Sequence, residues 1–268
     1  MRLLKNGFLF LAAVAIVLIA VGSGLLHAQA NSSGGVTVGR EESRQQRPLT
    51  AAVTVIDLNG PVDVVIQQGS VAAMTVRAEQ RMLPKVTTRQ EGDTLHIDTH
   101  GLFLGTVRPI LVELTLPALQ KVTQHGSGDI RIHRFKGDRF ELSMHGSGDL
   151  QMDGDFKQMA LGVQGSGDLQ FHTPSCEQLA LTLQGSGNVR ANGSCTALSA
   201  QISGSGDLDA GELHSDQVVL TVTGSGDGTV FARRTVKVAI AGSGNVDVRG
   251  KPVERSINST GSGEISFE

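Results

Sequence analysis

A column of acidic residues is the first feature of this sequence that could do chemistry. Each acid directly follows a Gly-Ser-Gly triplet, and the triplets recur every 18 to 20 residues. The acids are Asp129, Asp149, Asp168, Asp207 and Asp227, with Glu264 after the last triplet and Asn188 and Asn245 after two others. Repeated carboxylates could bind calcium weakly, because calcium takes oxygen ligands. The same side chains could instead accept hydrogen bonds from main-chain N–H groups, as Asp and Asn do in turns. The pattern favours the turn-forming role and leaves weak cation binding as the alternative.

Two histidines form a second candidate site. His125 and His145 each stand directly before a triplet, so we expect them to lie side by side in the fold. With Asp129 and Asp149 near them, they could hold a metal such as zinc, whose ligands include His and Asp. The competing interpretation is a repeated surface residue without a site. The sequence shows no catalytic motif, since Gly-Ser-Gly lacks the strand-to-helix context of a nucleophile elbow. We therefore predict no enzyme activity and no cofactor, with calcium as the one alternative.

The only two cysteines also occupy equivalent places. Cys176 and Cys195 each stand nine residues before a triplet. Equivalent residues in neighbouring coils lie about 4.8 Å apart, which is within the Cα separation that a disulfide tolerates. We expect a disulfide between them if the chain is exported to an oxidising compartment. A stacked pair of free thiols is the alternative, because parallel side chains point the same way.

The triplets themselves define the architecture. Eight copies at so regular a step are typical of a solenoid, in which each repeat forms one coil. Glycine reaches positive φ at little cost, so we expect both glycines of a triplet to make a sharp structural corner. These corner glycines are Gly126, Gly128, Gly146, Gly148, Gly165, Gly167, Gly185, Gly187, Gly204, Gly206, Gly224, Gly226, Gly242, Gly244, Gly261 and Gly263.

Apolar residues alternate with polar ones on both sides of each corner. Around Gly165, for example, Leu161 and Val163 precede the corner, and Leu169 and Phe171 follow it. This period of two indicates strands with one buried face, and no segment of the repeat has the period of a helix. The sequence therefore predicts an all-β chain that forms a single-stranded parallel β-helix, or solenoid, of coils of about 19 residues. The absence of a six-residue sub-period favours the right-handed form.

The chain before the corners divides into three parts. Residues 1–30 have the basic start, apolar stretch and Ala28-Gln29-Ala30 end of a signal peptide cleaved after Ala30. An uncleaved membrane anchor is the alternative, because the apolar stretch reaches the length of a span. Residues 31–48 are polar and are predicted to be a disordered linker. Residues 49–268 are predicted to be the solenoid domain, with 49–122 as irregular first coils that cap the eight repeats of 123–268.

Several short motifs in this order resemble one known family, the putative auto-transporter adhesin head GIN domain. They are Gly60-Pro61-Val62-Asp63-Val64, Gln68-Gly69, Leu83-Pro84-Lys85-Val86, Gly92-Asp93-Thr94-Leu95, Leu116-Pro117-Ala118-Leu119 and the ladder of corners. The resemblance covers residues 49–268 and implies a bacterial, exported, all-β solenoid. The family has no established biochemical role.

Composition narrows the function classes. The formal net charge is −3, whereas a nucleic-acid-binding protein needs a basic face. The chain has no Trp and no Tyr, which weakens any site that stacks sugars on aromatic rings. We therefore expect a non-catalytic exported protein of the periplasm or cell surface that serves adhesion or envelope structure and meets an unknown envelope or surface ligand. It would contact a membrane only through an uncleaved N-terminal segment. A carbohydrate-active or cation-binding β-helix protein is the alternative.

Overall fold

The computed structural model describes residues 40–101 and 108–268. The predicted signal peptide and residues 31–39 of the predicted linker lie outside the described residues. The strands are β1 Glu42–Arg47, β2 Val55–Asn59, β3 Val62–Gln68, β4 Ala73–Glu79, β5 Val86–Glu91, β6 Thr94–Thr99, β7 Ile110–Leu116, β8 Lys121–Gly126, β9 Ile130–Gly146, β10 Leu150–Gly165, β11 Leu169–Gly185, β12 Val189–Gly204, β13 Leu208–Gly224, β14 Gly228–Gly242, β15 Val246–Arg249, β16 Glu254–Gly261 and β17 Ile265–Phe267. One short 3-10 helix, Leu83–Lys85, lies among the described residues.

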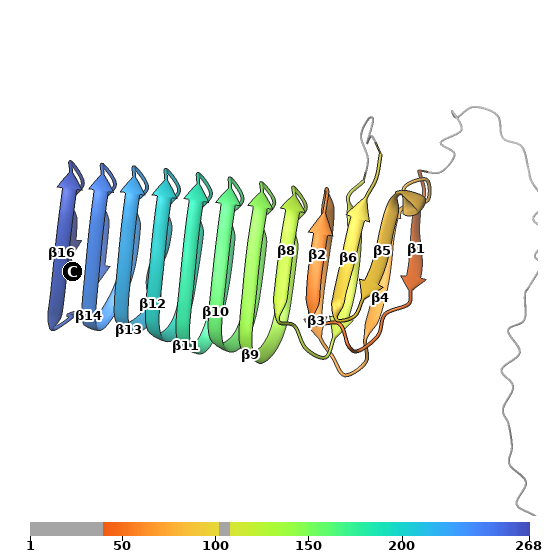
Figure 1. Ribbon diagram of the computed structural model, residues 1–268, viewed down its shortest axis with the longest axis horizontal. Coiled ribbons are helices and arrows are strands. Elements are labelled where there is room, and N and C mark those ends of the chain that lie inside the picture. The colour runs from red at the N-terminus through yellow and green to blue at the C-terminus, as the bar shows by residue number, and fades with distance from the viewer. Residues whose placement is uncertain (1–39, 102–107) are drawn as a thin grey trace, which may run out of the picture. The chain divides into compact units, whose positions relative to one another are not determined.

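The repeats form a stack of flattened coils (Figure 1), with a tight corner at one end of each coil and a bend at the other. Strands β9 to β14 each run from one corner to the next and bend midway, and neighbouring strands pair in parallel. The pairing places each corner on the corner of the next coil, as in Gly165 against Gly185. The predicted all-β parallel solenoid is confirmed, while its handedness stays a prediction.

The core is a set of apolar ladders inside the coils. In β11, the alternation buries Leu179, Leu181 and Leu183, and their neighbours face outward. The equivalent residues of the next coil are paired with them, as in Leu181 with Ala200. Each fully buried Leu or Val stabilises the fold by about 1.5–3 kcal/mol. Because apolar residues recur at equivalent positions of successive coils, a shift in the pairing register would expose them, and the observed register is favoured.

The first coils are threaded out of sequence order. Strand β2 pairs in parallel with both β6 and β8, and β3 pairs in parallel with both β7 and β9. The coil β2–β3 therefore lies between one made later in the chain by β6–β7 and the first triplet coil, β8–β9. In Figure 1, β2 stands between β8 and β6. Sequence order alone does not predict this insertion.

Strand β1 corrects the predicted linker, which was expected to be disordered through residue 48. Residues Glu42–Arg47 pair antiparallel with β4 along their whole length. The Arg47 guanidinium also donates to the carbonyl oxygens of Val86, at 2.7 Å, and Leu83, at 3.1 Å. A polar strand can form here because an edge strand needs main-chain partners rather than a buried face.

The two glycines of a corner have different roles, which corrects the expectation that both adopt positive φ. The first has a positive φ, as in Gly185 at 128°. The second has none, but a Cβ on Gly187 would overlap the carbonyl group of Gly167 in the preceding coil. The first glycine is therefore required by backbone conformation, and the second is required because the main chains of stacked corners approach too closely for a side chain.

The last coil has an open end. Strand β16 is exposed along its whole length because it pairs on one side only, with β14. The Arg255 guanidinium lies 4.2 Å from the centre of the Phe267 ring, and its Nε donates to the Pro252 carbonyl at 3.2 Å. A charged side chain thus lies over the end of the apolar core.

Candidate functional site

The acidic column forms one continuous hydrogen-bonded ladder. The side-chain Oδ1 of every member before Glu264 accepts a hydrogen bond from the main-chain N–H of the equivalent residue in the next coil. Asp149 Oδ1 accepts from Asp168 N–H at 3.0 Å, and Asp168 Oδ1 accepts from Asn188 N–H at 2.8 Å. The same bond joins Asp129 to Asp149, Asn188 to Asp207, Asp207 to Asp227, Asp227 to Asn245 and Asn245 to Glu264.

The energies show why such a column is stable without a cation. Two carboxylates about 4.8 Å apart repel by about 0.9 kcal/mol in water. A hydrogen bond to a charged group contributes about 1.5–3 kcal/mol, so one bond per coil exceeds the repulsion. Asn188 lowers the repulsion further, because it carries no charge and its Nδ2 donates to Asp168 Oδ1 at 3.1 Å. The ladder side chains therefore accept main-chain N–H groups of the next coil rather than of their own turn, and weak cation binding stays a prediction.

The ladder also has a member that the sequence analysis did not assign. Asp63 Oδ1 accepts a hydrogen bond from Asp129 N–H at 2.9 Å, and Gly60 has a positive φ of 105°. The stretch from Gly60 to Asp63 is thus a corner without Gly-Ser-Gly, on which the first triplet stacks. The signal was an acid three residues after a glycine, the spacing that every Gly-Ser-Gly-Asp corner has.

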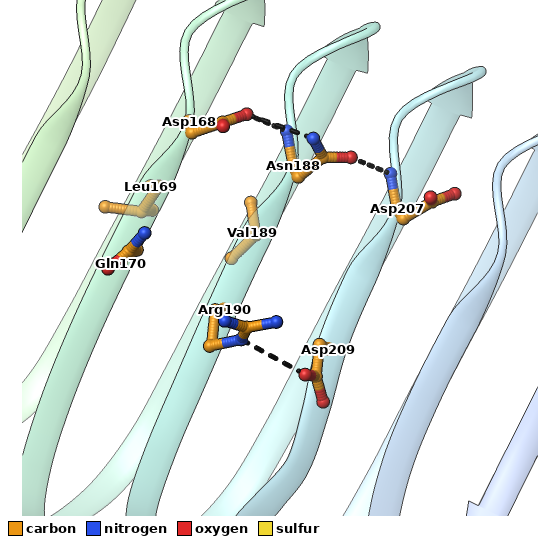
Figure 2. Close-up of a pocket in the computed structure, with 8 residues that line it drawn as sticks. All are labelled: Asp168, Leu169, Gln170, Asn188, Val189, Arg190, Asp207 and Asp209. Carbon is orange, nitrogen blue, oxygen red and sulfur yellow. Dashed lines mark hydrogen bonds and ion pairs between the residues drawn. The ribbon is translucent and has the colours of Figure 1, made fainter.

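A cavity of 410 Å³ opens beside the ladder on the strands that follow the corners (Figure 2). It is lined by Asp168, Leu169, Gln170, Asn188, Val189, Arg190, Asp207 and Asp209. The Leu169 and Val189 side chains are buried in the core, so these two residues contribute main chain. Arg190 Nε donates to Asp209 Oδ2 at 3.2 Å, and this pair crosses the cavity between β12 and β13 (Figure 2).

The two histidines lie as predicted but form a different kind of contact. The His125 and His145 rings stack with their centres 4.7 Å apart and their planes 8° from parallel. His145 Nδ1 lies 3.0 Å from Gln164 Oε1 in the next coil. Within residues 40–101 and 108–268, no group of three or more His, Cys, Asp or Glu side chains is arranged to hold a metal ion. Among the described residues, the zinc hypothesis is therefore left with the two stacked histidines and no third ligand beside them.

The cysteines are joined. Cys176 and Cys195 form a disulfide, with their Cα atoms 4.4 Å apart, and the two residues are paired between β11 and β12. The register of this pairing shifts between Thr173 and Cys176, so the bond lies at the bend, where the main chain departs from regular strand geometry. That departure removes the geometric objection to a bond between stacked residues.

Two ion pairs join segments of the first coils. The Glu79 side chain is 4% exposed, and its carboxylate lies 2.7 Å from Arg81 Nε. The Arg81 hydrogen bond, with a second one from the Arg108 main-chain N–H, lowers the pKa of Glu79. The pKa of Glu42 is also lowered, chiefly by its hydrogen bond from Arg77. These pairs fasten β1, β4 and the segment before β7 to one another.

The sequence of the coils matches a family of known proteins. The family described as "Putative auto-transporter adhesin, head GIN domain" matches residues 53–173 and 153–252. These two matches overlap and cover more than half of the chain, including β2 and seven of its Gly-Ser-Gly corners. The chain belongs to this family. The resemblance inferred from the sequence motifs is thereby confirmed.

Solved structures similar to this GIN-domain chain share its fold at low sequence identity. A putative adhesin from Parabacteroides merdae has a TM-score of 0.79 and 18% identity, over 85% of this chain and 96% of that one. A putative adhesin from Parabacteroides distasonis has a TM-score of 0.78 and 20% identity, over 85% and 97%. A protein titled putative lipid binding protein, also from Parabacteroides distasonis, has a TM-score of 0.75 and 22% identity, over 85% and 96%. At these identities the likeness shows the fold alone.

None of the curated proteins matches the GIN-domain chain. In the part of the chain that the structure describes, no helix is long and apolar enough to cross a membrane.

Proposed function

We propose that this chain is an exported, non-catalytic solenoid that serves adhesion or another surface interaction of a bacterial envelope. Membership of the adhesin head GIN domain family supports this proposal, as does the N-terminal segment with the pattern of a signal peptide. The names of two structurally similar proteins, both putative adhesins, point the same way.

One observation carries the non-catalytic part of the proposal. The conspicuous acids of the chain follow the repeat, and Asp149, Asp168 and Asp207 each accept a main-chain N–H of the next coil. A catalytic carboxylate must instead be free to reach the proton or atom that it attacks in a substrate. The ladder acids are therefore used to hold the coils together, and the outer faces of the coils are left for contact with a partner.

The experiment is fractionation of bacterial cells that express the full chain, combined with protease treatment of the intact cells. We expect the protein in the envelope fraction or the periplasm, with its N-terminus at Asn31 by mass spectrometry. Digestion in intact cells would indicate display at the surface, and protection until the outer membrane is opened would indicate a periplasmic protein. Recovery of the unprocessed chain from the cytosol would refute the proposal.

A further inference from the structure

A second cavity extends the one beside the ladder. It has a volume of 340 Å³ and is lined by residues of β9 to β12, including Gln151, Asp153 and His133. Both cavities are lined by Gln170 and Arg190, so they adjoin at these two residues, and we refer to the two together as the groove. The groove crosses the outer face of the strands that follow the corners, from β9 to β13. Its direction is along the stack of coils, perpendicular to the strands.

The groove has a main-chain floor and polar walls. Met152, Phe171 and Val189 point into the core, so they present only main chain to the groove. The walls are amide, imidazole, carboxylate and guanidinium groups. The groove therefore offers hydrogen-bonding groups beside exposed carbon surface, which comes in part from the aliphatic stems of its polar side chains.

Several of the wall side chains have no partner of their own. Among the described residues, Gln151, Gln170 and Asp153 form no side-chain hydrogen bond or ion pair within the protein. Gln151 and Gln170 are paired in register on β10 and β11, so their main chains are one strand spacing apart, about 4.8 Å. An amide both donates and accepts. The groove thus repeats free donors and acceptors at the spacing of the coils.

The charges on the walls of the groove limit the chemical classes of ligand that could bind there. Asp168 and Asp207 are acidic and already accept main-chain N–H groups, and Arg190 is neutralised by Asp209. The remaining field is negative, which disfavours nucleic acid and acidic polysaccharide. A peptide would gain its main-chain hydrogen bonds at a sheet edge, whereas this groove crosses paired strands that have no free edge. An uncharged ligand that is rich in hydroxyl groups could donate hydrogen bonds to the free amides and accept hydrogen bonds from them.

We propose that the groove between β9 and β13 binds a neutral, unbranched oligosaccharide that lies along the solenoid. This inference rests on the proposed function as a surface-interaction protein and names the class of ligand. Binding occurs through hydrogen bonds to Gln151 and Gln170 rather than by aromatic stacking, because the chain has no Trp or Tyr. The affinity therefore grows with the number of sugar units that contact successive coils.

The test is isothermal titration calorimetry of the full chain, as processed by its host, with four probes. Cellohexaose, maltohexaose and hexa-N-acetylchitohexaose are the neutral ligands, and hexalysine tests whether the acidic walls select a cation instead. The test variant is Gln151→Ala with Gln170→Ala. The control variant is Gln164→Ala with Gln184→Ala, an amide pair in register on the same two strands but before the corners, on the other face of the coils.

We expect at least one neutral hexasaccharide to bind, and its trisaccharide to bind more weakly. The test variant should bind it about 25-fold more weakly, since it lacks two amides and each neutral hydrogen bond contributes roughly a factor of five. The control variant should bind as the unchanged protein does. Circular dichroism confirms that both variants are folded, which is expected because all four residues are on the surface.

Three results would overturn the inference: no neutral hexasaccharide binds, hexalysine binds in their place, or both double variants lose affinity equally. Release of new reducing ends would show catalysis and overturn the non-catalytic proposal instead. Fractionation separates the two proposals. A chain that is exported but binds no hexasaccharide refutes the glycan groove alone, whereas a cytosolic chain refutes the proposed function whatever the calorimetry shows.

Discussion

A side chain added at either glycine of one corner should destabilise the fold. Both positions lack room for a Cβ, and only the first also has a positive φ. Gly185 has a φ of 128°, a conformation that costs a residue with a Cβ about 1–3 kcal/mol. Its Cβ would also overlap the carbonyl group of Gly165 below it. Gly187 has no positive φ, but its Cβ would overlap the main chain of Gly167. Since the overlapping atoms are main chain in a paired stack, neither coil can move aside without losing hydrogen bonds.

We therefore expect Gly185→Ala and Gly187→Ala each to lower the free energy of unfolding by more than about 1 kcal/mol. For a domain of this size, that corresponds to a fall in Tm of at least about 3 °C. Far-ultraviolet circular dichroism is the appropriate probe, because the chain has no Trp or Tyr for fluorescence. Urea midpoints at an unchanged m value give an independent measure.

Substitutions at two other glycines distinguish backbone strain from steric overlap of the added Cβ. A Cβ on Gly162 would meet nothing closer than Leu142 O at 3.6 Å, and Gly162 has no positive φ, so Gly162→Ala should be neutral or stabilise by up to about 1 kcal/mol. Gly92 has a φ of 62° and open space around it, so Gly92→Ala reports backbone strain alone. If Gly187→Ala melts like Gly162→Ala, the close approach of stacked corners is not what requires the second glycine.

Three other changes test the ladder, the disulfide and the buried carboxylate. Asp168→Asn should keep the Tm within about 1 °C, because Asn keeps the oxygen that accepts the hydrogen bond, whereas Asp168→Ala should lower the Tm by several degrees. A Tm that rises in millimolar calcium but not in chelator would instead favour a cation site. Reduction of Cys176–Cys195 should cost on the order of 3 kcal/mol, and two free thiols in the denatured, unreduced protein would disprove the bond. The lowered pKa of Glu79 stabilises the fold above its ordinary pKa of 4.5, so thermal stability should fall as the pH drops below that value. Glu79→Gln should weaken this acid dependence in a pH series of melting curves, and an identical pH profile would contradict the role of the Arg81 contact.

The repeat could be predicted because its information is local and periodic. Gly-Ser-Gly with alternating apolar residues specifies a coil, and equal spacing places Cys176 beside Cys195 and each acid beside the next. Even the ladder follows from this, since a side chain at a fixed place in one coil meets the N–H of the same place in another. Any feature that depends only on stacking identical coils is therefore visible in the residues.

Other features depend on pairings between segments that differ in sequence, and only the tertiary structure decided them. Strand β2 enters the stack between β6 and β8, because pairing partners are chosen by the surface that each edge offers and not by chain order. Strand β1 forms although its residues are polar, because β4 supplies main-chain partners. Gln170 follows one corner and Gln184 directly precedes the next, and nothing in the sequence marks either of these exposed amides as part of a groove. The fold places Gln170 in the groove and Gln184 on the other face of its coil, because β11 bends between Thr173 and Cys176 and its two halves face different ways.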